Sequence, residues 1–445
     1  MQLPIFSDMV FRSDGMSEDC LYLNVWTPAR SAGRLLPVLV YFYGGGFVGG
    51  DGSELRYDGE SLARKGIVVV TTNYRLGVFG FLAHPELTRE SPHHASGNYA
   101  LLDQAAALSW VRRNIAAFGG DPHRVTIGGE SAGSISVTAL MASPLSRRLI
   151  AGAIGESGGM IYPTAAPVSL DTAERLGEAF ARGVGATSLA ALRALPAESL
   201  LKATGRPGRG RFSATIDGWF LPDTPANILA AGKQAQVPLL VGWNSEESGW
   251  KALLGEREPT PQAYDSALRT LFGANADEAL RLFPVATTEQ VLESATFLAG
   301  ARFIAYSTWK WAELHRGNGR DVYRYLYAHP RPAAKDPVQN PPHTGAVHSS
   351  EIEYALGNLA TNQVYNWTPE DFALSDLMGT YFANFVKTGD PNGAGLPSWP
   401  AAYSDVSARV MVLDIRSRAE PALHEDAFRF LERFYRAGRD RVLRR

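Results

Sequence analysis

Residues 124–142 read RVTIGGESAGSISVTALMA and decide the fold class of this chain. The apolar run RVTI ends in two glycines, and small and apolar residues with a helical pattern follow. The pentapeptide Gly129–Gly133 between them matches G-x-S-x-G, a sharp strand-to-helix turn that holds a serine hydroxyl clear of the backbone. The order of strand, turn and helix predicts that Ser131 is a nucleophile at the end of a buried parallel strand.

A second pentapeptide, Gly155–Gly159, matches the same pattern around Ser157. It also follows an apolar run, but two glycines and then Pro163 come next, and nothing there indicates the start of a helix. We therefore favour Ser131 over Ser157 as the nucleophile. We expect Ser157 to be a buried hydroxyl that hydrogen-bonds near the site, and Glu130 to be a buried, hydrogen-bonded support beside the nucleophile.

The rest of the first half alternates apolar strands with helical patterns. Buried parallel strands are short and apolar on both faces, and five segments fit that description: 37–42, 67–72, 124–127, 150–154 and 237–241. Helical patterns at 98–118 and 131–142 lie between them. This alternation predicts a doubly wound α/β fold whose ligands bind at the carboxyl ends of the strands.

The second half is less regular, and helices dominate it. Two later strands are expected at 322–328 and 409–415. The mostly helical stretches are 170–193, 261–282, 287–314, 369–386 and 422–437. We expect these helices to cap the sheet and to shape a pocket.

Composition excludes several classes of protein. The 43 Lys and Arg residues balance 45 Asp and Glu residues, which argues against a nucleic-acid-binding protein. No stretch approaches the roughly 18–20 apolar residues that a membrane-spanning helix needs. The single cysteine, Cys20, has no partner for an intrachain disulfide, which suits a reducing compartment. Residues 1–16 show no signal-peptide pattern, so we expect a cytoplasmic protein, although a shortened N-terminus leaves secretion open.

A glycine-rich loop follows the first apolar strand, where Tyr43–Phe47 reads YGGGF. Acyl transfer passes through a tetrahedral intermediate with a negative oxygen, and backbone N–H groups of such a loop can converge on that oxygen. We expect the amides of Gly45 and Gly46 to form this oxyanion hole. The amide of Ala132, just after the nucleophile, is the third expected donor.

The same loop allows two further interpretations. Gly44, Gly46 and Gly49 fit the dinucleotide fingerprint G-x-G-x-x-G, but the following residues read as a loop and supply no helix to bind a phosphate. The second interpretation is a tight turn without a functional role. We expect no organic cofactor and no metal ion, because H-E-x-x-H is absent and the pair His93-His94 lacks partners at ligand spacing.

Six spaced motifs occur in a fixed order along the chain. They are Ser17–Asn24 (SEDCLYLN), Tyr43–Phe47, Asn73–Gly77 (NYRLG), Gly97–Asn98, Phe118–Pro122 (FGGDP) and Gly129–Gly133. In this order they resemble the type-B carboxylesterases, the cholinesterase-like branch of the α/β-hydrolases, and the match extends to the C-terminus. The resemblance implies an α/β-hydrolase fold, with a mostly parallel central sheet flanked by helices and a helical cap region.

The resemblance also implies one catalytic domain over residues 1–445. Its first part, 17–245, would hold the first half of the core sheet and the nucleophile. The acid, the cap helices and the histidine loop would follow in 246–400, and the last strand and the C-terminal helix in 401–445.

Members of this family form a triad in the chain order Ser, Glu, His. By resemblance the acid is Glu247, in the segment 242–248 that reads GWNSEES. Glu246 is the runner-up, and a surface glutamate facing solvent is its other interpretation. Asp217 is a distant third. The family usually has glycine directly after the acid, where this chain has Ser248.

Five of the nine histidines follow that acid in the chain. Residues 345–354 read GAVHSSEIEY and match the segment that bears the family's catalytic histidine, which makes it His348. A neutral imidazole can take the Ser131 proton and return it to the leaving alkoxide. His343, in a Pro-rich loop, is the second candidate.

Two features of the N-terminal region depend on the resemblance. Related proteins use the positions of Glu18 and Arg75 for a structural ion pair, so we expect structural roles for these residues. Family members have a further segment before the Ser17 motif, which forms a small N-terminal sheet and carries the usual partner of Cys20. We expect that sheet to be missing here, and Cys20 to be a free thiol.

The resemblance implies a carboxylic ester hydrolase that forms an acyl-enzyme. We expect it to act on small to medium apolar or aromatic esters, because an apolar pocket would favour such groups. Candidate pocket walls are Phe47, Phe79, Trp250, Phe303, Tyr306 and Trp309, although aromatic residues at helical spacing more often belong to the core. Two competing hypotheses are a catalytically inactive adhesion or scaffold protein on the same fold, and a lipase. The expected partner is a small-molecule ester, and the sequence does not indicate an oligomeric state.

Overall fold

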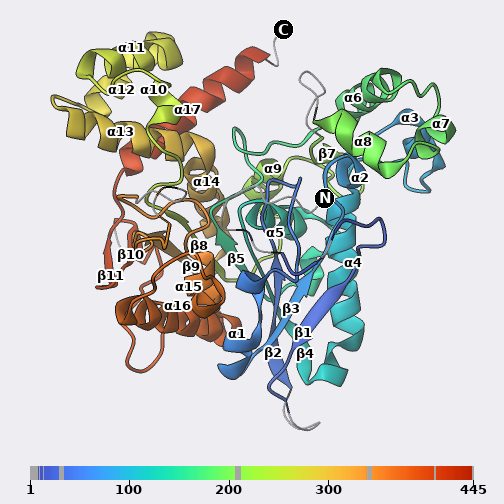
Figure 1. The fold of residues 1–445 in the computed structure, drawn as a ribbon, viewed down its shortest axis with the longest axis horizontal. Helices are drawn as coiled ribbons and strands as arrows, with labels where there is room; N and C mark the ends of the chain where they lie inside the picture. The colour runs from blue at the N-terminus through green and yellow to red at the C-terminus, as the bar shows by residue number, and fades with distance from the viewer. Residues whose placement is uncertain are drawn as a thin grey trace.

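A nine-stranded sheet lies at the centre of the molecule (Figure 1). The computed structural model describes residues 9, 11–13, 15–29, 35–205, 212–336, 338, 343–404 and 407–442. The strands of the sheet are β1 (Leu23–Trp26), β2 (Leu36–Phe42), β3 (Val68–Thr72), β4 (Gly120–Glu130), β5 (Gly152–Glu156), β8 (Leu239–Asn244), β9 (Val322–Tyr327), β10 (Arg409–Leu413) and β11 (Arg418–Pro421). Their order in space is β1-β3-β2-β4-β5-β8-β9-β10-β11.

The seven inner strands, from β3 to β10, pair in parallel, and only the two edge strands, β1 and β11, are antiparallel to their neighbours. The strands expected from apolar runs are confirmed, because burial on both faces gives each inner strand a continuous apolar sequence. In register, Gly129 of β4 lies beside Gly155 of β5, and Glu130 lies beside Glu156. The two G-E-S-x-G motifs therefore end neighbouring strands at the same edge of the sheet.

Helices cover both faces of the sheet. One face is covered by α4 (Tyr99–Asn114), α5 (Ala132–Ala142) and α14 (Tyr306–His315), and the other by α1 (Glu60–Arg64), α15 (Ile352–Leu356) and α16 (Pro369–Thr388). A Cβ on Gly155 would stand 2.2 Å from the ring of Trp311, so α14 packs directly on the backbone of β5. Both ends of helix α16 are well defined: Thr368 and Asp371 form a capping box, and Gly389 ends the helix in a left-handed conformation.

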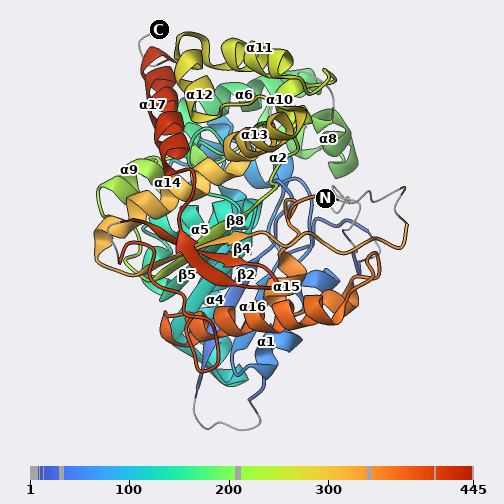
Figure 2. The same ribbon diagram turned by 90° about the vertical axis from the view of Figure 1, so that its left-hand side faces the viewer.

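All but one of the remaining α-helices described form two groups beyond the end of the sheet (Figures 1 and 2). The first group contains α2 (Gly77–Phe81), α3 (Pro85–Glu90), α6 (Leu170–Gly183), α7 (Leu189–Arg193) and α8 (Ala197–Thr204). The second contains α10 (Lys251–Leu254), α11 (Pro261–Phe272), α12 (Ala276–Leu282), α13 (Thr288–Gly300) and the C-terminal α17 (Glu425–Val442). Each group has its own cluster of buried apolar side chains, separate from the main core on the sheet.

Three details refine the expected elements. The helical stretches 170–193 and 261–282 each contain two helices, and 287–314 is helical throughout but includes a π-helical segment, Ala301–Ala305. The short helix α9 (Pro225–Ala230) packs between α5 and α14, and β6 (Val168–Ser169) pairs with β7 (Thr215–Ile216) in a separate two-stranded sheet. None of the helices described is both long enough and apolar enough to cross a bilayer.

Candidate active site

Ser131 is the residue between β4 and α5, and its backbone has φ 53° and ψ −118°. A positive φ is uncommon for a residue with a side chain, and it marks a strained turn. A Cβ on Gly133 would stand 2.0 Å from the carbonyl oxygen of Phe42, and a Cβ on Gly129 would stand 2.6 Å from the carbonyl carbon of Gly133. Glycine is therefore required at both positions, because the start of α5 passes against the end of β2.

Three side chains from separate segments meet at this turn. His348 Nε2 lies 2.9 Å from Ser131 Oγ, and His348 Nδ1 lies 2.6 Å from Glu247 Oε2. The backbone N–H of Asn244, the last residue of β8, donates to the other oxygen of Glu247 at 2.7 Å. The side chains of His348 and Glu247 are only 8% and 1% exposed, so little water reaches this pair.

Hydrogen bonds join the loop that carries Glu247 to the segment directly before His348. The backbone N–H of Glu246 donates to the carbonyl of Ala346 at 2.8 Å, and the Glu246 carboxylate accepts from the N–H of Gly345 at 3.0 Å. The Asn244 side chain donates to the carbonyl of Val347 at 2.8 Å. Glu246 is thus a half-buried support of the histidine loop and not a glutamate that faces solvent.

Three carboxylates face the imidazole: Glu130, Glu247 and Glu351. Glu130 Oε1 lies 3.3 Å from His348 Nε2. Burial raises the pKa of Glu130, Glu156 and Glu351, that of Glu351 to about 8. Burial alone would lower the pKa of His348, but the negative charges of Glu130 and Glu247 and the hydrogen bond to Glu247 raise it to about 9. The electrostatics of the site therefore favour an imidazolium, the form that follows proton uptake from a serine.

The glycine loop after β2 lies against the nucleophile turn. A Cβ on Gly44 would stand 2.4 Å from the carboxylate of Glu130. Gly45 and Gly46 have φ 107° and 61°, conformations that glycine adopts readily. Within the described residues, no backbone carbonyl outside the helices and strands accepts a hydrogen bond from the N–H of Gly45, Gly46 or Ala132. Ala132 opens α5, so its N–H has no intrahelical acceptor. The three amides stay the expected oxyanion donors.

Ser157 resembles Ser131 in backbone geometry but not in surroundings. Its φ is also 53°, and it follows β5 directly. Its side chain is fully buried, and its hydroxyl donates to a carboxylate oxygen of Glu351 at 3.3 Å. The next helix, α6, begins only at Leu170. The imidazole of His348 is thus placed at Ser131, with Ser157 beneath the site.

Asp217 and the remaining histidines after the acid lie away from the Ser131–His348 contact. Asp217 accepts hydrogen bonds from the side chain of Asn98 and from two backbone N–H groups of its own turn. His343 is 49% exposed, and its Nδ1 lies 3.8 Å from Glu246. The other three histidines have different neighbours. His315 contacts the Val237 carbonyl, His329 contacts Asp371 and Asp414, and His424 contacts the ring of Phe297.

The expected ion pair of the N-terminal motifs involves Arg75 but a different carboxylate. Arg75 Nη2 and Nε donate to the two oxygens of Asp103 at 2.7 and 2.8 Å, and the Arg75 backbone N–H also donates to Asp103. Asp103 is 6% exposed on α4, whereas Glu18 lies in an exposed segment. Asp103 can accept two parallel hydrogen bonds from the Arg75 guanidinium, a strong arrangement for an arginine and a carboxylate.

Of the candidate pocket walls, Phe303 lies beside the catalytic candidates. Its ring centroid is 5.0 Å from that of His348, in an edge-to-face arrangement, and its side chain is 44% exposed. It belongs to the π-helical segment Ala301–Ala305, an irregularity common at functional sites. Phe47, directly after the glycine loop, packs edge-on against Phe81 at 5.0 Å.

Three other candidates belong to the core of the second helical group. Trp309 is fully buried and stacks on Phe428 of α17, with ring centroids 5.4 Å apart. Tyr306 is buried against Tyr435 of the same helix at 5.0 Å. Trp250 is partly buried at the edge of this cluster. The structure therefore brings Phe303, and not these three, into ring contact with His348.

Phe79 lines a separate groove of about 550 Å³ between α2, α4, α7 and α8. Ser131, Glu247 and His348 do not line this groove. Both arginines that line it are paired: Arg193 with Glu90 and Arg75 with Asp103. In the described parts of the chain, no group of three or more His, Cys, Asp and Glu residues is arranged to hold a metal ion.

Sequence reasoning missed three polar residues that support the site. Asn244 and Glu351 are joined by a hydrogen bond of 2.5 Å, and both lie in segments already chosen for the acid and the histidine. Their nearness could have been inferred, because those two segments must meet. Arg331 donates to the Ser349 carbonyl next to His348, but it lies in a loop that carries no recognisable motif. Nothing in its local sequence points to that contact.

Three comparisons with known proteins bear on this site. The sequence model of the carboxylesterase family matches residues 1–431. The chain is similar to carboxylesterase 5A of Canis lupus familiaris, with 38% identity over 440 residues that cover 93% of this chain and 73% of that protein. It is 36% identical to the cocaine esterase of Homo sapiens, over 88% of this chain and 71% of the relative.

Two further similarities come from bacteria and from solved structures. The fumonisin B1 esterase of Sphingopyxis macrogoltabida is 35% identical over 87% of this chain and 72% of that protein. A solved structure of PNB esterase superposes with a TM-score of 0.75 and 32% identity, and the match covers 93% of this chain and 83% of that chain. The sequence and fold comparisons therefore agree with each other.

Proposed function

Because the chain belongs to the carboxylesterase family and is a carboxylic ester hydrolase, we propose that Ser131, His348 and Glu247 are its catalytic triad. One observation carries the proposal: His348 contacts Ser131 Oγ through Nε2 and Glu247 through Nδ1. These partners lie 217 and 101 residues from His348 in the chain. Side chains so far apart in sequence meet in the order of nucleophile, base and acid that acyl transfer requires.

In the first half of the reaction, Ser131 Oγ attacks the carbonyl carbon of the ester, and its proton passes to His348 Nε2. The carbonyl oxygen becomes an oxyanion that accepts hydrogen bonds from the amides of Gly45, Gly46 and Ala132. The tetrahedral intermediate then collapses, the bond to the alcohol oxygen breaks, and His348 gives its proton to the leaving alkoxide. The products are a free alcohol and an acyl-serine.

In the second half, water replaces the alcohol. His348 takes a proton from the water as its oxygen attacks the acyl carbon, and a second oxyanion occupies the same donors. Collapse releases the carboxylic acid, and the proton on His348 returns to Ser131 Oγ. Glu247 holds the Nδ1–H tautomer of His348 and stabilises the imidazolium in both halves.

The preferred substrates are small to medium esters with apolar or aromatic groups. The exposed ring of Phe303 beside His348 supports this preference, because it gives the alcohol or acyl group an apolar surface next to the base. Phe47 adds an aromatic ring directly after the oxyanion loop. The single-domain organisation and the cytoplasmic location expected from the sequence stay predictions.

Hydrolysis of p-nitrophenyl acetate by the purified protein and by Ser131→Ala tests the triad. We expect Ser131→Ala to lose ester hydrolysis, by about 10³-fold or more in kcat, while its circular dichroism stays that of the wild type. Ser157→Ala is the matched control, since it removes the hydroxyl of the other motif, and we expect it to keep far more activity than Ser131→Ala. An active Ser131→Ala together with an inactive Ser157→Ala would move the nucleophile to Ser157.

Two assays distinguish an esterase from an inactive scaffold and from a lipase. No hydrolysis of any short ester by the folded wild type would favour the inactive scaffold. A series of p-nitrophenyl esters of increasing acyl length tests the lipase hypothesis, and we expect kcat/KM to be highest for short and medium chains. A strong preference for long chains presented as an emulsion would contradict the esterase assignment.

A further inference from the structure

The turn that carries His348 has an unusual backbone. Ser349, the next residue, has φ 68°, which a residue with a side chain rarely adopts. The direction of the imidazole depends on this turn, because the strained residue follows His348 directly. Before His348, the carbonyl of Val347 is held by Asn244. After it, the chain needs a second anchor if the imidazole is to keep its direction.

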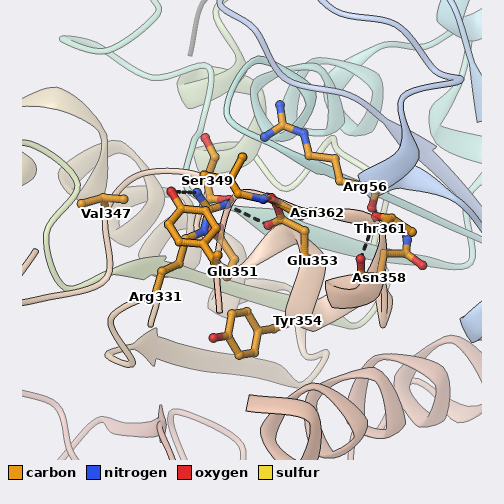
Figure 3. Close-up of polar contacts among 12 residues, drawn as sticks. Arg56, Arg331, Val347, Ser349, Glu351, Glu353, Tyr354, Asn358, Thr361 and Asn362 are labelled. Atoms are coloured by element: carbon orange, nitrogen blue, oxygen red, sulfur yellow. Dashed lines mark hydrogen bonds and ion pairs between the residues drawn. The ribbon is translucent and has the colours of Figure 1, made fainter. Parts of the chain in front are cut away.

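Arg331 provides that anchor. Its Nη2 donates to the Ser349 carbonyl oxygen at 3.3 Å and to Glu353 Oε2 at 2.8 Å. Figure 3 shows the guanidinium beside this turn, between Ser349 and Glu353. The Arg331 side chain is only 7% exposed. One buried cation therefore contacts both the strained turn and the helix that follows it.

The position of the guanidinium is itself well defined. The other oxygen of Glu353 accepts from Asn362 Nδ2 at 2.7 Å, and the Glu353 side chain is fully buried. The guanidinium also lies over the ring of Tyr365, 5.0 Å from its centroid, and Nη1 donates to the Tyr365 hydroxyl at 3.3 Å. The Tyr365 ring contacts the face of the guanidinium, and Ser349 and Glu353 contact its edge. The Arg331 side chain therefore has little freedom to move.

We propose that Arg331 is a positioning residue for catalysis: through the Ser349 carbonyl it holds the His348 imidazole between Ser131 and Glu247. The inference rests on the proposed triad, and it assigns to Arg331 no contact with substrate. The Glu353 carboxylate balances the charge of Arg331, so the pair does not place a net charge behind the base.

Arginine suits this place better than lysine does. A guanidinium is planar and offers several N–H groups in a fixed fork, so it can stack on Tyr365 and contact Ser349 and Glu353 together. The ammonium of a lysine is a point charge on a flexible stem. It can keep the ion pair with Glu353, but it cannot make all three contacts at once. Arg331→Lys therefore separates the ion pair, which it keeps, from the anchoring of Ser349, which it loses.

Arg324 is a matched control for this substitution. It too is a buried arginine, 1% exposed, with a carboxylate partner, Glu425, at 2.9 Å. Its guanidinium also lies over an aromatic ring, that of Trp243, at 5.5 Å. These two partners belong to α17 and β8 and not to the histidine loop. Arg324→Lys thus measures the general cost of changing a buried arginine in this fold.

The experiment compares p-nitrophenyl acetate hydrolysis by the wild type, Arg331→Lys and Arg324→Lys. We expect Arg331→Lys to lower kcat by about 10- to 100-fold with KM within about twofold, because a small displacement of the base affects the chemical step and not binding. We expect Arg324→Lys to keep the wild-type kcat. A wild-type kcat in Arg331→Lys, or an equal loss in Arg324→Lys, would overturn the proposal.

The pH profile supplies a readout that a purely structural role would not move. The imidazole is faced by Glu130 at the end of β4, Glu247 after β8 and Glu351 at the start of α15. If Arg331→Lys lets the ring move away from these carboxylates, the lower limb of kcat/KM shifts to lower pH. A lower limb of kcat/KM at the same pH as in the wild type would contradict the proposed movement of the imidazole.

A double variant removes the charge pair without leaving a buried carboxylate unpaired. Arg331→Met with Glu353→Gln should lose at least as much kcat as Arg331→Lys, at a thermal midpoint that still allows assay at about 25 °C; a double variant with wild-type kcat would overturn the proposal. Ser131→Ala, run in parallel, separates the two hypotheses. Loss of activity in Ser131→Ala with full kcat in Arg331→Lys rejects only the role of Arg331, whereas an active Ser131→Ala rejects the triad.

Discussion

At the scale of single residues, the charge state of His348 controls the chemistry. The base must be neutral to take the Ser131 proton, yet the negative charges around it raise its pKa to about 9. A raised pKa means that the neutral form, and with it kcat/KM, increases as pH rises through that value. The lower limb of the profile should therefore lie above the ordinary histidine range near about pH 6.5.

Substitution of Glu130 tests which charge raises the pKa of His348. Glu130→Gln removes a negative charge 3.3 Å from Nε2, so we expect the lower limb of kcat/KM to move down by about one pH unit or more. The measurement is kcat/KM for a p-nitrophenyl ester between about pH 5 and 10. Glu198→Gln, in a surface pair with Lys202, is the control and should not move the limb. A limb that stays in place in Glu130→Gln contradicts this electrostatic account.

Two adjacent glutamates allow a direct test of the acid. Glu247→Gln removes the charge that stabilises the imidazolium and should lower kcat by about 10³- to 10⁴-fold. Glu246→Gln changes a side chain that holds the backbone of Gly345, and we expect a loss below about tenfold. Steady-state kinetics of both variants under the same conditions provide the comparison. A larger loss in Glu246→Gln would overturn the assignment of Glu247.

At the scale of elements, the turn between β4 and α5 depends on glycine. In a helix interior, alanine is more favourable than glycine by about 1 kcal/mol. Helix propensity alone therefore predicts that Gly133→Ala stabilises α5. The new Cβ, however, would stand 2.0 Å from the Phe42 carbonyl oxygen, and the clash should lower the free energy of unfolding by about 3 kcal/mol or more.

Thermal and urea denaturation of Gly133→Ala checks this prediction. Gly249→Ala is the matched control, because no atom lies within 4 Å of its new Cβ. We expect Gly133→Ala to melt well below the wild type and Gly249→Ala to melt close to it. Equal midpoints for the two variants would show that β2 and α5 are not packed as described.

Element by element, the sequence predicts best where burial dictates composition. The inner strands can be recognised because both of their faces are apolar, as in Val68–Thr72. The edge strands Leu23–Trp26 and Arg418–Pro421 were missed because short strands, buried on one side at most, carry no such run. The triad residues could be chosen from motifs, but Arg331 could not, since its role depends on a tertiary contact with Ser349.

At the scale of the whole molecule, the second helical group, which includes α17, has a core of its own beside the active site. Trp309 is fully buried there and stacks on Phe428, whereas Phe303, earlier in the same helical stretch, is 44% exposed against His348. One face of this helical stretch therefore stabilises the cap, and the other lines the approach to the base.

Alanine variants of these two residues should separate stability from specificity. Trp309→Ala leaves a large cavity and should lower the free energy of unfolding by about 3–5 kcal/mol. Phe303→Ala should leave stability within about 1 kcal/mol but raise KM for aromatic esters relative to acetate esters. Denaturation curves and kinetics on both ester types check the pair. A destabilised Phe303→Ala with unchanged substrate preference would contradict the division of roles.

The most direct test of the account is to find which serine is activated. A fluorophosphonate reacts covalently with an activated serine, and peptide mass spectrometry identifies the modified residue. We predict one adduct per chain, on Ser131, that forms quickly in the wild type and at least about 10³-fold more slowly in His348→Gln. An adduct on Ser157, or labelling of Ser131 at the same rate without the imidazole, would contradict the proposed site.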